Sequence, residues 1–554
     1  MNRREFLDKA VRTGLAGAVF GSSTLRLSGS PTSSDHFSPE SETPAPKPYP
    51  VKPFAWEEVT IDELQRQFTD GKTSSLALTR AYLGRIEQLD RHGPRLGSVL
   101  ELNPDAEALA HQADSERKVG HVRGPLHGVP VLVKDNLDTH DRMATSAGSL
   151  ALASWHPPQD SFVVARLRSA GAIILGKSNL SEWANFRGSN SVSGWSGRGG
   201  LTRNPYALDR NPSGSSSGSG AAVSANLCTV AIGTETDGSI VSPASVNGLV
   251  GVKPTVGLVS GTGIIPIASS QDTAGPLART VRDAALLLGV IAGRDPRDSA
   301  TALIPSDLSF DFTRGLKRDA LRGARLGVAR QFFGFHPTVE RLMHGVLDQL
   351  KTLGAELIDP VELPNGAERD RAEFEVLLYE FKSELNTYLG SLPLGMGVRS
   401  LAELIAFNEA HRAEELKWFG QETLIKAEAK GPLTEPAFRE ALATCRRISR
   451  DEGIDAVMTE HRLDALIAPT GGPACITDLL VGDTEIGGST SPAAVAGYPA
   501  VTVPSALWRG LPIGLTFFGR AWSEAKLLGY AFAWEQASKV RTVPRFYPTL
   551  PIGN

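Results

Sequence analysis

The sequence predicts an α/β fold, in which a buried sheet of mostly parallel or mixed strands is combined with helices. Short apolar runs rich in β-branched residues recur along the chain, as at Val129–Val133. Segments with helix-capping signals alternate with these runs, beginning at Thr60–Glu63. Because only loops separate the candidate strands, we expect residues 54–554 to form one large domain.

The strands are predicted from runs that are short, apolar and flanked by turn residues. The runs are Val129–Val133, Ala172–Leu175, Thr229–Ile232, Arg325–Val328, Ala465–Ala468, Ala500–Val503 and Gly514–Phe518. Lys134 directly follows the first of them, so we expect it at the carboxyl end of a buried strand.

Helices are predicted where capping residues precede periodic apolar patterns. One begins at the capping box of Thr60–Glu63, and a second runs from about Ser74 to Leu89. Asp160-Ser161 caps a helix that ends near Gly171, and Thr280 caps Val281–Ala292 with Gly293 behind it. Residues 366–450 are charged and are expected to be mainly helical.

The composition narrows the class of protein. With 41% apolar residues, 21% charged residues and a net charge of −4, the chain suits an ordinary globular protein. This mildly acidic balance disfavours nucleic acid or an anionic membrane as the main partner. Three cysteines are too few and too scattered for a disulfide framework, and Cys228 is expected to be a small buried hydrophobe. No metal-binding motif occurs, so neither a metal nor a cofactor is expected.

The N-terminus predicts export from the cytoplasm. Arg3-Arg4 followed by Phe6-Leu7 and a short Gly/Ala-rich segment resembles a twin-arginine signal over residues 1–30, which addresses folded proteins to the periplasm or beyond. The alternative is a frayed basic helix. The apolar segment is too short for a stable membrane span. Residues 31–53 are rich in Ser and Pro and are expected to form an extended linker.

Two glycine-rich loops and a lysine form a candidate catalytic set. The loops are Gly214–Gly220 and Gly233–Ser239, and Lys134 is the lysine. Consecutive N–H groups in such a turn can converge on an oxyanion, so Ser239 is placed to attack the carbonyl that they polarise. Burial would lower the pKa of Lys134 and make it a base, and Ser215 would relay the proton between them.

Each feature alone also has a plain structural explanation. A glycine-serine stretch is often a linker, Lys134 alone would be a surface residue, and Ser239 alone a turn residue. A dinucleotide site fits less well, because neither loop reads G-x-G-x-x-G directly after a strand. The three features together favour an acyl-transfer site.

The chain from about Trp56 to its C-terminus resembles the amidase signature family. The shared segments are Gly128–Asn136, Gly176–Ala184, the two glycine-serine loops, Gly251–Thr255, Ala468–Thr470 and Leu511–Leu515. The resemblance implies an α/β/α fold around a mixed sheet and a Ser–Ser–Lys triad.

The resemblance also implies a role for each residue of the triad and its loop. Ser239 matches the acylated nucleophile, Ser215 the bridging serine after a cis peptide bond, and Lys134 the base. The oxyanion hole would be formed by the backbone N–H groups of Thr236, Asp237, Gly238 and Ser239.

Two departures from the family pattern bear on the substrate. Asp237 stands where a second glycine is common, and Val241 where the glutamine-using subunit that amidates mischarged tRNA is expected to have an arginine. Segments Gly233–Val241, Asn204–Tyr206 and Ser181–Gly188 are most similar to the peptide amidase branch, which removes the C-terminal amide of peptides.

The sequence therefore predicts an exported amidase that converts carboxamides to carboxylate and ammonia, with peptide amides favoured. The runner-up is a broad-specificity amidase for small aliphatic or aromatic amides, and a glutamine amidotransferase subunit and a non-catalytic binding protein are less favoured. Trp183, Phe186 and Trp195 are candidates for the pocket lining, although aromatic residues are more often part of the core. The oligomeric state, the side-chain preference and the role of residues 366–450 stay open.

Overall fold

The computed structural model describes residues 46–364 and 366–550. The expected export signal at 1–30 and the linker up to residue 45 lie outside the described residues. Residues 46–53 form no helix or strand, and the Tyr49 N–H donates to the Phe546 carbonyl at 3.0 Å. Within the described part of the chain, no helix combines the length and the apolar character that a membrane crossing requires.

The centre of the domain is an 11-stranded mixed sheet, in the order β1-β3-β2-β6-β8-β7-β12-β13-β11-β9-β10. Its strands are β1 (Val99–Leu102), β2 (Pro130–Lys134), β3 (Ile173–Ser178), β6 (Val230–Glu235), β7 (Val250–Lys253), β8 (Thr273–Ala278), β9 (Arg325–Ala329), β10 (Glu356–Val361), β11 (Ala465–Pro469), β12 (Ala500–Trp508) and β13 (Leu511–Phe518). A separate pair is formed by β4 (Trp195–Ser196) and β5 (Gly200–Leu201). β2 is parallel to both of its neighbours, β3 and β6, whereas β12 and β13 form an antiparallel pair.

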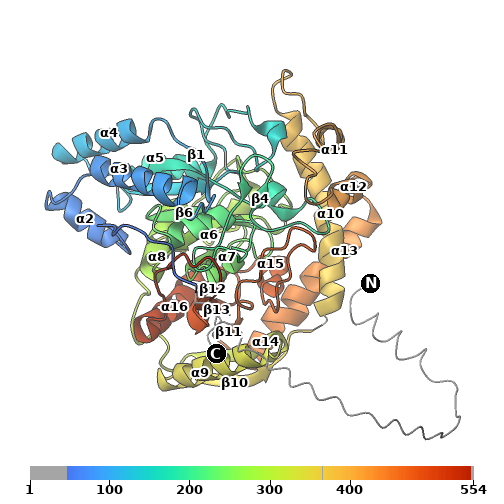
Figure 1. Ribbon diagram of the computed structural model, residues 1–554. Coiled ribbons are helices and arrows are strands. Elements are labelled where there is room, and N and C mark those ends of the chain that lie inside the picture. The colour runs from blue at the N-terminus through green and yellow to red at the C-terminus, as the bar shows by residue number, and fades with distance from the viewer. Residues whose placement is uncertain (1–45, 365, 551–554) are drawn as a thin grey trace, which may run out of the picture. The chain divides into compact units, whose positions relative to one another are not determined.

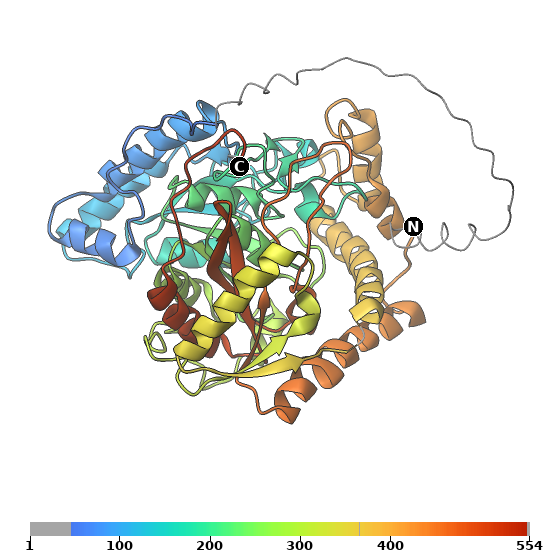
Figure 2. The same cartoon turned by 60° about the horizontal axis from the view of Figure 1, so that its bottom comes forward.

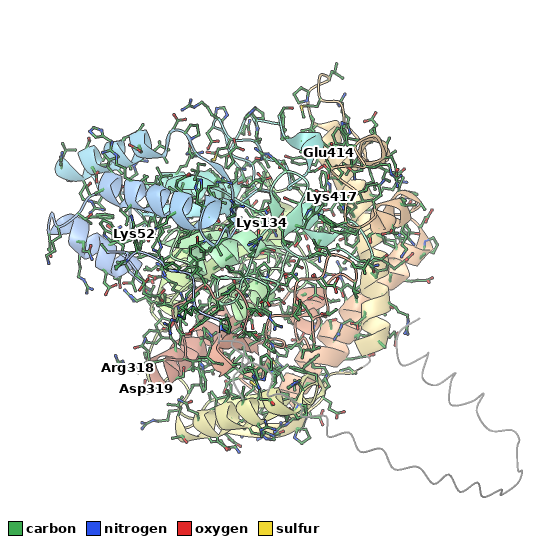
Figure 3. All side chains as sticks on the ribbon, in the orientation of Figure 1. Lys52, Lys134, Arg318, Asp319, Glu414 and Lys417 are labelled. Carbon is green, nitrogen blue, oxygen red and sulfur yellow. The ribbon has the colours of Figure 1, made fainter. Side chains whose placement is uncertain are left out.

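The sheet is covered on both faces. Successive side chains of a strand point to opposite faces, and every residue of β2, β3 and β6 is buried. The prediction of an α/β domain with a buried mixed sheet is therefore confirmed. Lys134, at the end of β2, lies deep in the molecule, whereas labelled side chains such as Lys52 and Lys417 lie at its periphery (Figure 3).

The predicted strands are all present, but four others of the central sheet and the short pair β4–β5 were not predicted. The pattern of apolar residues does not reveal β1, β7, β8 and β10. These strands are short, contain Gly or Pro, or show only weak alternation of apolar and polar residues. β10 is an edge strand with exposed positions and contains Pro360, which the edge of a sheet tolerates.

The predicted helix starts are confirmed by their caps. The Thr60 side chain accepts a hydrogen bond from the Glu63 N–H, and the Glu63 side chain accepts from the Thr60 N–H. Ser74, Ser161 and Thr280 also cap their helices. The helices of the first half are α2 (Ile61–Thr69), α3 (Ser75–Ile86), α4 (Ala106–Lys118), α5 (Phe162–Ser169), α6 (Ser217–Ser224), α7 (Val241–Val246) and α8 (Val281–Ile291).

Residues 366–450 are mainly helical, as predicted. They form α10 (Gly366–Gly390), α11 (Leu401–Ala410), α12 (Glu422–Glu428) and α13 (Pro436–Arg446). The remaining helices are α9 (Pro337–Thr352), α14 (Asp455–Glu460), α15 (Ser491–Ala496) and α16 (Glu524–Ser538). α10–α13 lie on the side of the domain opposite α2–α4 (Figures 1 and 2), and α10 supplies residues to the site described next.

Candidate active site

Lys134 is a buried lysine with defined partners. Its side chain is fully buried, and Nζ lies 2.7 Å from Ser215 Oγ. Nζ also donates to the Thr234 carbonyl at 3.1 Å and lies 2.8 Å from Thr234 Oγ1. Thr234 is part of β6, which pairs with β2 in parallel, so the sheet itself sets the position of the amine.

The protonation of Lys134 is governed by its burial. Loss of solvent lowers the pKa of Lys134 to about 7, although the nearby carboxyl groups of Asp272 and Glu235 act in the opposite direction. A substantial part of the amine is therefore uncharged near neutral pH, and an uncharged amine can accept a proton.

Ser215 lies in the loop before α6 and follows a cis peptide bond with Gly214, as the resemblance implied. A Cβ atom at Gly214 would overlap the Ser181 and Ser193 hydroxyls, so a larger residue there would force those side chains to move. The Ser181 N–H donates to the Ser215 carbonyl at 3.0 Å and holds the loop in place.

The two glycine-serine loops lie side by side. The Ser216 N–H donates to the Ser239 carbonyl at 3.2 Å, which joins the loops directly. Within the described residues, Lys134 Nζ is the hydrogen-bond partner of the Ser215 hydroxyl, and no hydrogen bond links the hydroxyls of Ser215 and Ser239.

Ser239 faces a cavity of about 420 Å³, hereafter the Ser239 cavity. The serine is 8% exposed. The cavity is lined by Ala184, Asn185, Phe186, Ser193, Ser213, Gly214, Thr236–Ser239, Ser242, Ile267, Leu377, Asp483, Glu485 and Thr490. Phe186 is therefore a lining residue, whereas Trp183 and Trp195 are buried and line neither this cavity nor its larger neighbour.

The turn that contains Ser239 is held by a carboxylate that the sequence analysis did not single out. Glu235 accepts hydrogen bonds from the N–H groups of Gly238 at 3.0 Å, Ile240 at 2.7 Å and Val241 at 3.0 Å. Gly238 has a φ of 78°, a conformation that glycine adopts without strain. Burial raises the pKa of Glu235, while Lys253 opposes that shift.

The turn leaves three of the four expected oxyanion donors available. The Gly238 N–H is taken by Glu235. The N–H groups of Thr236, Asp237 and Ser239 have no acceptor among the described residues, and all three residues line the Ser239 cavity.

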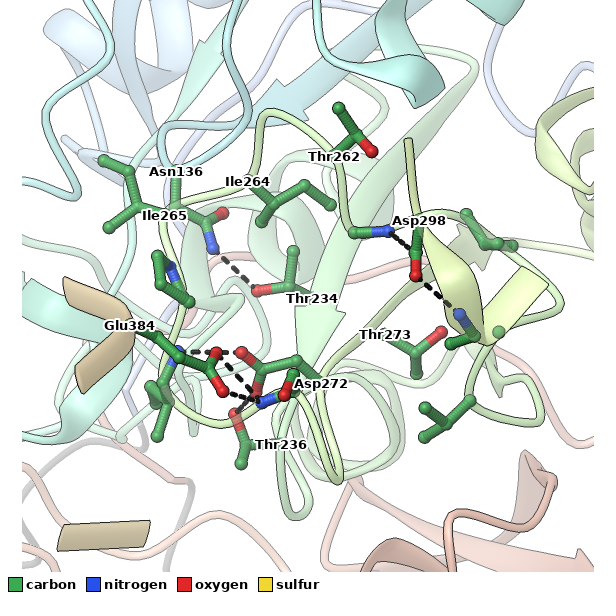
Figure 4. Close-up of a pocket in the computed structure, with 18 of the residues that line it drawn as sticks. Asn136, Thr234, Thr236, Thr262, Ile264, Ile265, Asp272, Thr273, Asp298 and Glu384 are labelled. Atoms are coloured by element: carbon green, nitrogen blue, oxygen red, sulfur yellow. Dashed lines mark hydrogen bonds between the residues drawn. The ribbon is translucent and has the colours of Figure 1, made fainter. Parts of the chain in front are cut away.

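A second, larger cavity of about 560 Å³ adjoins the first and is shown in Figure 4. Ala184, Thr236 and Ile267 line both cavities. Asp272 accepts from the Thr236 hydroxyl at 2.5 Å and so fixes a residue of the turn. Neither Asp272 nor Thr234 is indicated as a site residue by the sequence, although Thr234 and Glu235 lie inside the glycine loop Gly233–Ser239, which marks their surroundings.

The described residues contain no group of three His, Cys, Asp or Glu side chains placed to hold a metal ion. Cys228 and Cys445 are buried, and Cys475 is partly buried; all three are free thiols. Cys228 is the small buried hydrophobe that the sequence predicts.

Comparison with known proteins places the chain in a family. The family model for amidases matches residues 77–528. The structure resembles the native peptide amidase from Stenotrophomonas maltophilia with a TM-score of 0.85 and 52% identity, over 89% of this chain and 100% of that one. A probable amidase of Arabidopsis thaliana is 42% identical over 89% of this chain and 92% of its own length. A glutamyl-tRNA(Gln) amidotransferase subunit of Halorhodospira halophila is 36% identical over 86% and 97%. The chain therefore belongs to the amidase family, as an enzyme that hydrolyses amides.

Proposed function

We propose that the protein hydrolyses carboxamides to carboxylate and ammonia through an acyl-enzyme on Ser239, and that its favoured substrates are the C-terminal amides of peptides. The observation on which this rests is the buried contact of 2.7 Å between Lys134 Nζ and Ser215 Oγ, next to the loop that carries Ser239. The similarity to a peptide amidase over nearly the whole of the described chain supports the substrate class.

In the acylation step, uncharged Lys134 takes a proton from Ser215, and Ser215 takes the proton of Ser239. Ser239 Oγ then bonds to the carbonyl carbon of the amide. The oxyanion that forms accepts hydrogen bonds from the N–H groups of Thr236, Asp237 and Ser239.

In the steps that follow, the C–N bond breaks as the relay returns a proton to the leaving nitrogen, and ammonia departs. Water attacks the ester carbon in the same way, giving the carboxylic acid and restoring the Ser239 hydroxyl.

The polar atoms of the Ser239 cavity suit an amide better than a carboxylate. Asn185 Oδ1 and Asp237 Oδ1 are buried acceptors that have no hydrogen-bond partner among the described residues, so each can accept from a substrate N–H. The ionisable lining residues, Asp237, Asp483 and Glu485, are all acidic. Free glutamine, with its α-carboxylate, would meet repulsion there.

The same features rank the alternatives. The amidotransferase subunit is a candidate because several relatives of this chain bear that name, but Val241 is an aliphatic, fully buried residue in the position where the arginine is expected. A broad amidase for small amides would use the same chemistry and leave most of the cavity unfilled. A non-catalytic binding protein would not require a buried lysine beside a serine.

Ammonia release from a panel of peptide amides, simple amides and free glutamine tests the proposal. We expect peptide amides to have the highest kcat/KM. Ser239→Ala is expected to abolish turnover, and Ser215→Ala and Lys134→Ala to lower kcat by orders of magnitude. Ser154→Ala, at an exposed position, is the matched control. Wild-type rates in Ser239→Ala would refute the assignment of the nucleophile.

A fluorophosphonate probe provides an independent check. Mass spectrometry should locate the covalent adduct on the peptide that contains Ser239. An adduct on Ser215 or Ser216 in its place would reassign the attacking hydroxyl.

We also infer that the protein is exported, on the basis of Arg3-Arg4 and the segment that follows them. Fractionation of cells that produce the full chain should then find activity outside the cytoplasm, and Arg3→Lys with Arg4→Lys should retain it inside.

A further inference from the structure

The larger cavity beside the active site, hereafter the Glu384 cavity, combines apolar walls with an acidic lining. Val256, Val259, Ile264 and Ile265 form apolar wall, and Asp272, Asp298 and Glu384 are the lining carboxyl groups. In Figure 4, Glu384 and Asp272 lie on the same side of the cavity, opposite Asp298. The cavity meets the Ser239 cavity at Thr236, a residue of the catalytic turn.

Within the described residues, the carboxyl groups of this cavity are held by backbone N–H groups and not by ion pairs, and Lys134 acts on Asp272 only through space. Glu384 accepts from the Ser269 N–H with both oxygens, at 3.0 and 3.1 Å. Asp298 accepts from two other backbone N–H groups, and none of the three carboxyl groups forms a salt bridge. The lining cation, Arg297, is already paired with Asp295 at 3.0 Å.

A second, independent feature is a buried acceptor without a partner. Asn136 is 3% exposed and lines this cavity. Its Nδ2 donates to Thr234 Oγ1 at 3.0 Å, which fixes the orientation of the amide, and its Oδ1 has no hydrogen-bond partner among the described residues. This buried acceptor is therefore free to take a hydrogen bond from a bound molecule.

We propose that the Glu384 cavity binds an ammonium or guanidinium group carried by the amide substrate, and so makes the enzyme selective for amides of basic peptides; this rests on the function proposed above. The apolar walls would cover the methylene stem of a lysine or arginine side chain. Asn136 Oδ1 and the carboxylates would accept hydrogen bonds from the charged head.

Selectivity of this kind depends on pH with a definite sign. The pKa of Glu384 is raised to about 8, mainly by burial and also by the neighbouring carboxyl groups of Asp272 and Glu380, against the lowering effect of the hydrogen bonds with Ser269. Burial also raises the pKa of Asp272 to about 6, which Lys134 and the Thr236 hydroxyl oppose. A bound cation favours the ionised carboxylates, so the preference for cationic substrates should increase from about pH 6 to about pH 9.

The test compares two peptide amides that differ only by lysine or norleucine at the amidated residue, and a second pair that differs at the residue before it. The measured quantity is the ratio of kcat/KM for lysine over norleucine. In the wild-type protein we expect this ratio to exceed about ten for one pair at pH 8.5. Glu384→Gln should lower the ratio about tenfold, with most of the change in KM, and leave the norleucine substrate nearly unaffected.

A second variant adds charge in place of removing it. Thr387 lines the same cavity at an exposed position one turn further along α10, so Thr387→Lys should place a competing cation there and also lower the ratio. The matched control is Glu375→Gln, on the same helix, whose carboxylate pairs with Lys430 and lines neither cavity. That variant should keep the wild-type ratio.

The outcomes separate this proposal from the proposed function. If norleucine amides release ammonia but the ratio is near one, or is unchanged in both variants, the cation site is refuted and the amidase function stands. If Glu384→Gln lowers kcat equally for both substrates, the cavity acts on the release of ammonium and not on the substrate side chain, which also refutes the proposal. If no peptide amide is hydrolysed, the proposed function fails and this inference fails with it.

Discussion

Glu235 gives the catalytic turn its shape from within the same stretch of chain. Its carboxylate accepts three backbone N–H groups of the turn and of the start of α7. The N–H groups that it does not bind are the ones left available to a substrate. A single side chain therefore selects which donors of the turn can act on an oxyanion.

Replacing Glu235 by Gln should lower kcat strongly. The amide nitrogen of Gln would face N–H groups that need an acceptor, so the turn would shift, and loss of one oxyanion donor typically costs about 10²-fold in rate. Removing the nearby negative charge should also lower the pKa of Lys134 and move the acid limb of the pH profile to lower pH. Steady-state kinetics at several pH values measure both effects, and an unchanged kcat would contradict the assigned role.

The burial of Lys134 predicts the pH dependence of the reaction. Because the pKa of Lys134 is lowered to about 7, the active uncharged amine is lost as the pH falls below that value. For a neutral substrate, kcat/KM should rise about tenfold per pH unit below about 7 and level off above it. A flat profile between about pH 5.5 and 8.5 would show that Lys134 is not the base.

The sequence predicted the proposed catalytic residues of the site better than the residues that surround them. Ser215, Ser239 and Lys134 stood out because glycine-rich loops and the end of an apolar run are local signals. Asp272 and Glu384 reach the site from distant segments, and no local pattern distinguishes them from surface carboxylates. Long-range folding alone brings them together.

At the level of elements, α10 is tied to the loop that follows β2. The Tyr388 hydroxyl donates a hydrogen bond to Asp138 Oδ1 at 2.8 Å. The same hydroxyl accepts a hydrogen bond from Trp155 Nε1 at 3.1 Å. Burial raises the pKa of Asp138 to about 6, and the hydrogen bond from Tyr388 opposes this shift by stabilising the ionised carboxylate. The helix that supplies Glu384 is thereby joined to the segment that contains Lys134.

Tyr388→Phe should therefore destabilise the protein by about 1 to 2 kcal/mol, because it leaves two part-buried polar groups unpaired. Urea unfolding measures the difference. Tyr530→Phe is the control: Tyr530 is 6% exposed and its hydroxyl has no hydrogen bond among the described residues, so less than about 0.5 kcal/mol is expected. An equal loss of unfolding free energy in the two variants would mean that the hydrogen bonds of Tyr388 add no stability of their own.

Strand β8 shows why some elements could not be predicted. Gly275 and Pro276 give its sequence the signature of a turn. In the structure, a Cβ at Gly275 would overlap the carbonyl of Val252 on the neighbouring strand, so the glycine marks close contact between backbones. The strand exists because its neighbours β6 and β7 pair with it on either side.

At the scale of the whole molecule, the sheet is one continuous structure that joins the two halves of the chain. Phe517 in β13 is fully buried and pairs with Val501 of β12 and Ile467 of β11. The general α/β architecture could be predicted because alternating strands and helices impose it. The strand order could not, because pairings such as β7 with β12 link segments far apart in the sequence.

Phe517→Ala should lower the free energy of unfolding by about 3 to 5 kcal/mol, since it removes a large side chain from the core and leaves a cavity. Leu394→Ala, at a position that is 87% exposed, should change it by less than about 0.5 kcal/mol. Calorimetry of the two variants checks this expectation. A small loss for Phe517→Ala would mean that the sheet repacks around the gap.

The catalytic residues and the wall of the Glu384 cavity come from different segments of the chain. Lys134, Ser215 and the turn that ends at Ser239 come from one continuous stretch, residues 134–239, whereas much of the wall of the Glu384 cavity comes from residues 256–300 and from α10. On the role proposed for that cavity, substitutions in the later segments alter which amides are accepted while the attacking group keeps its geometry. Substrate preference and the attack on the amide are thus set by parts of the sequence that can be substituted separately.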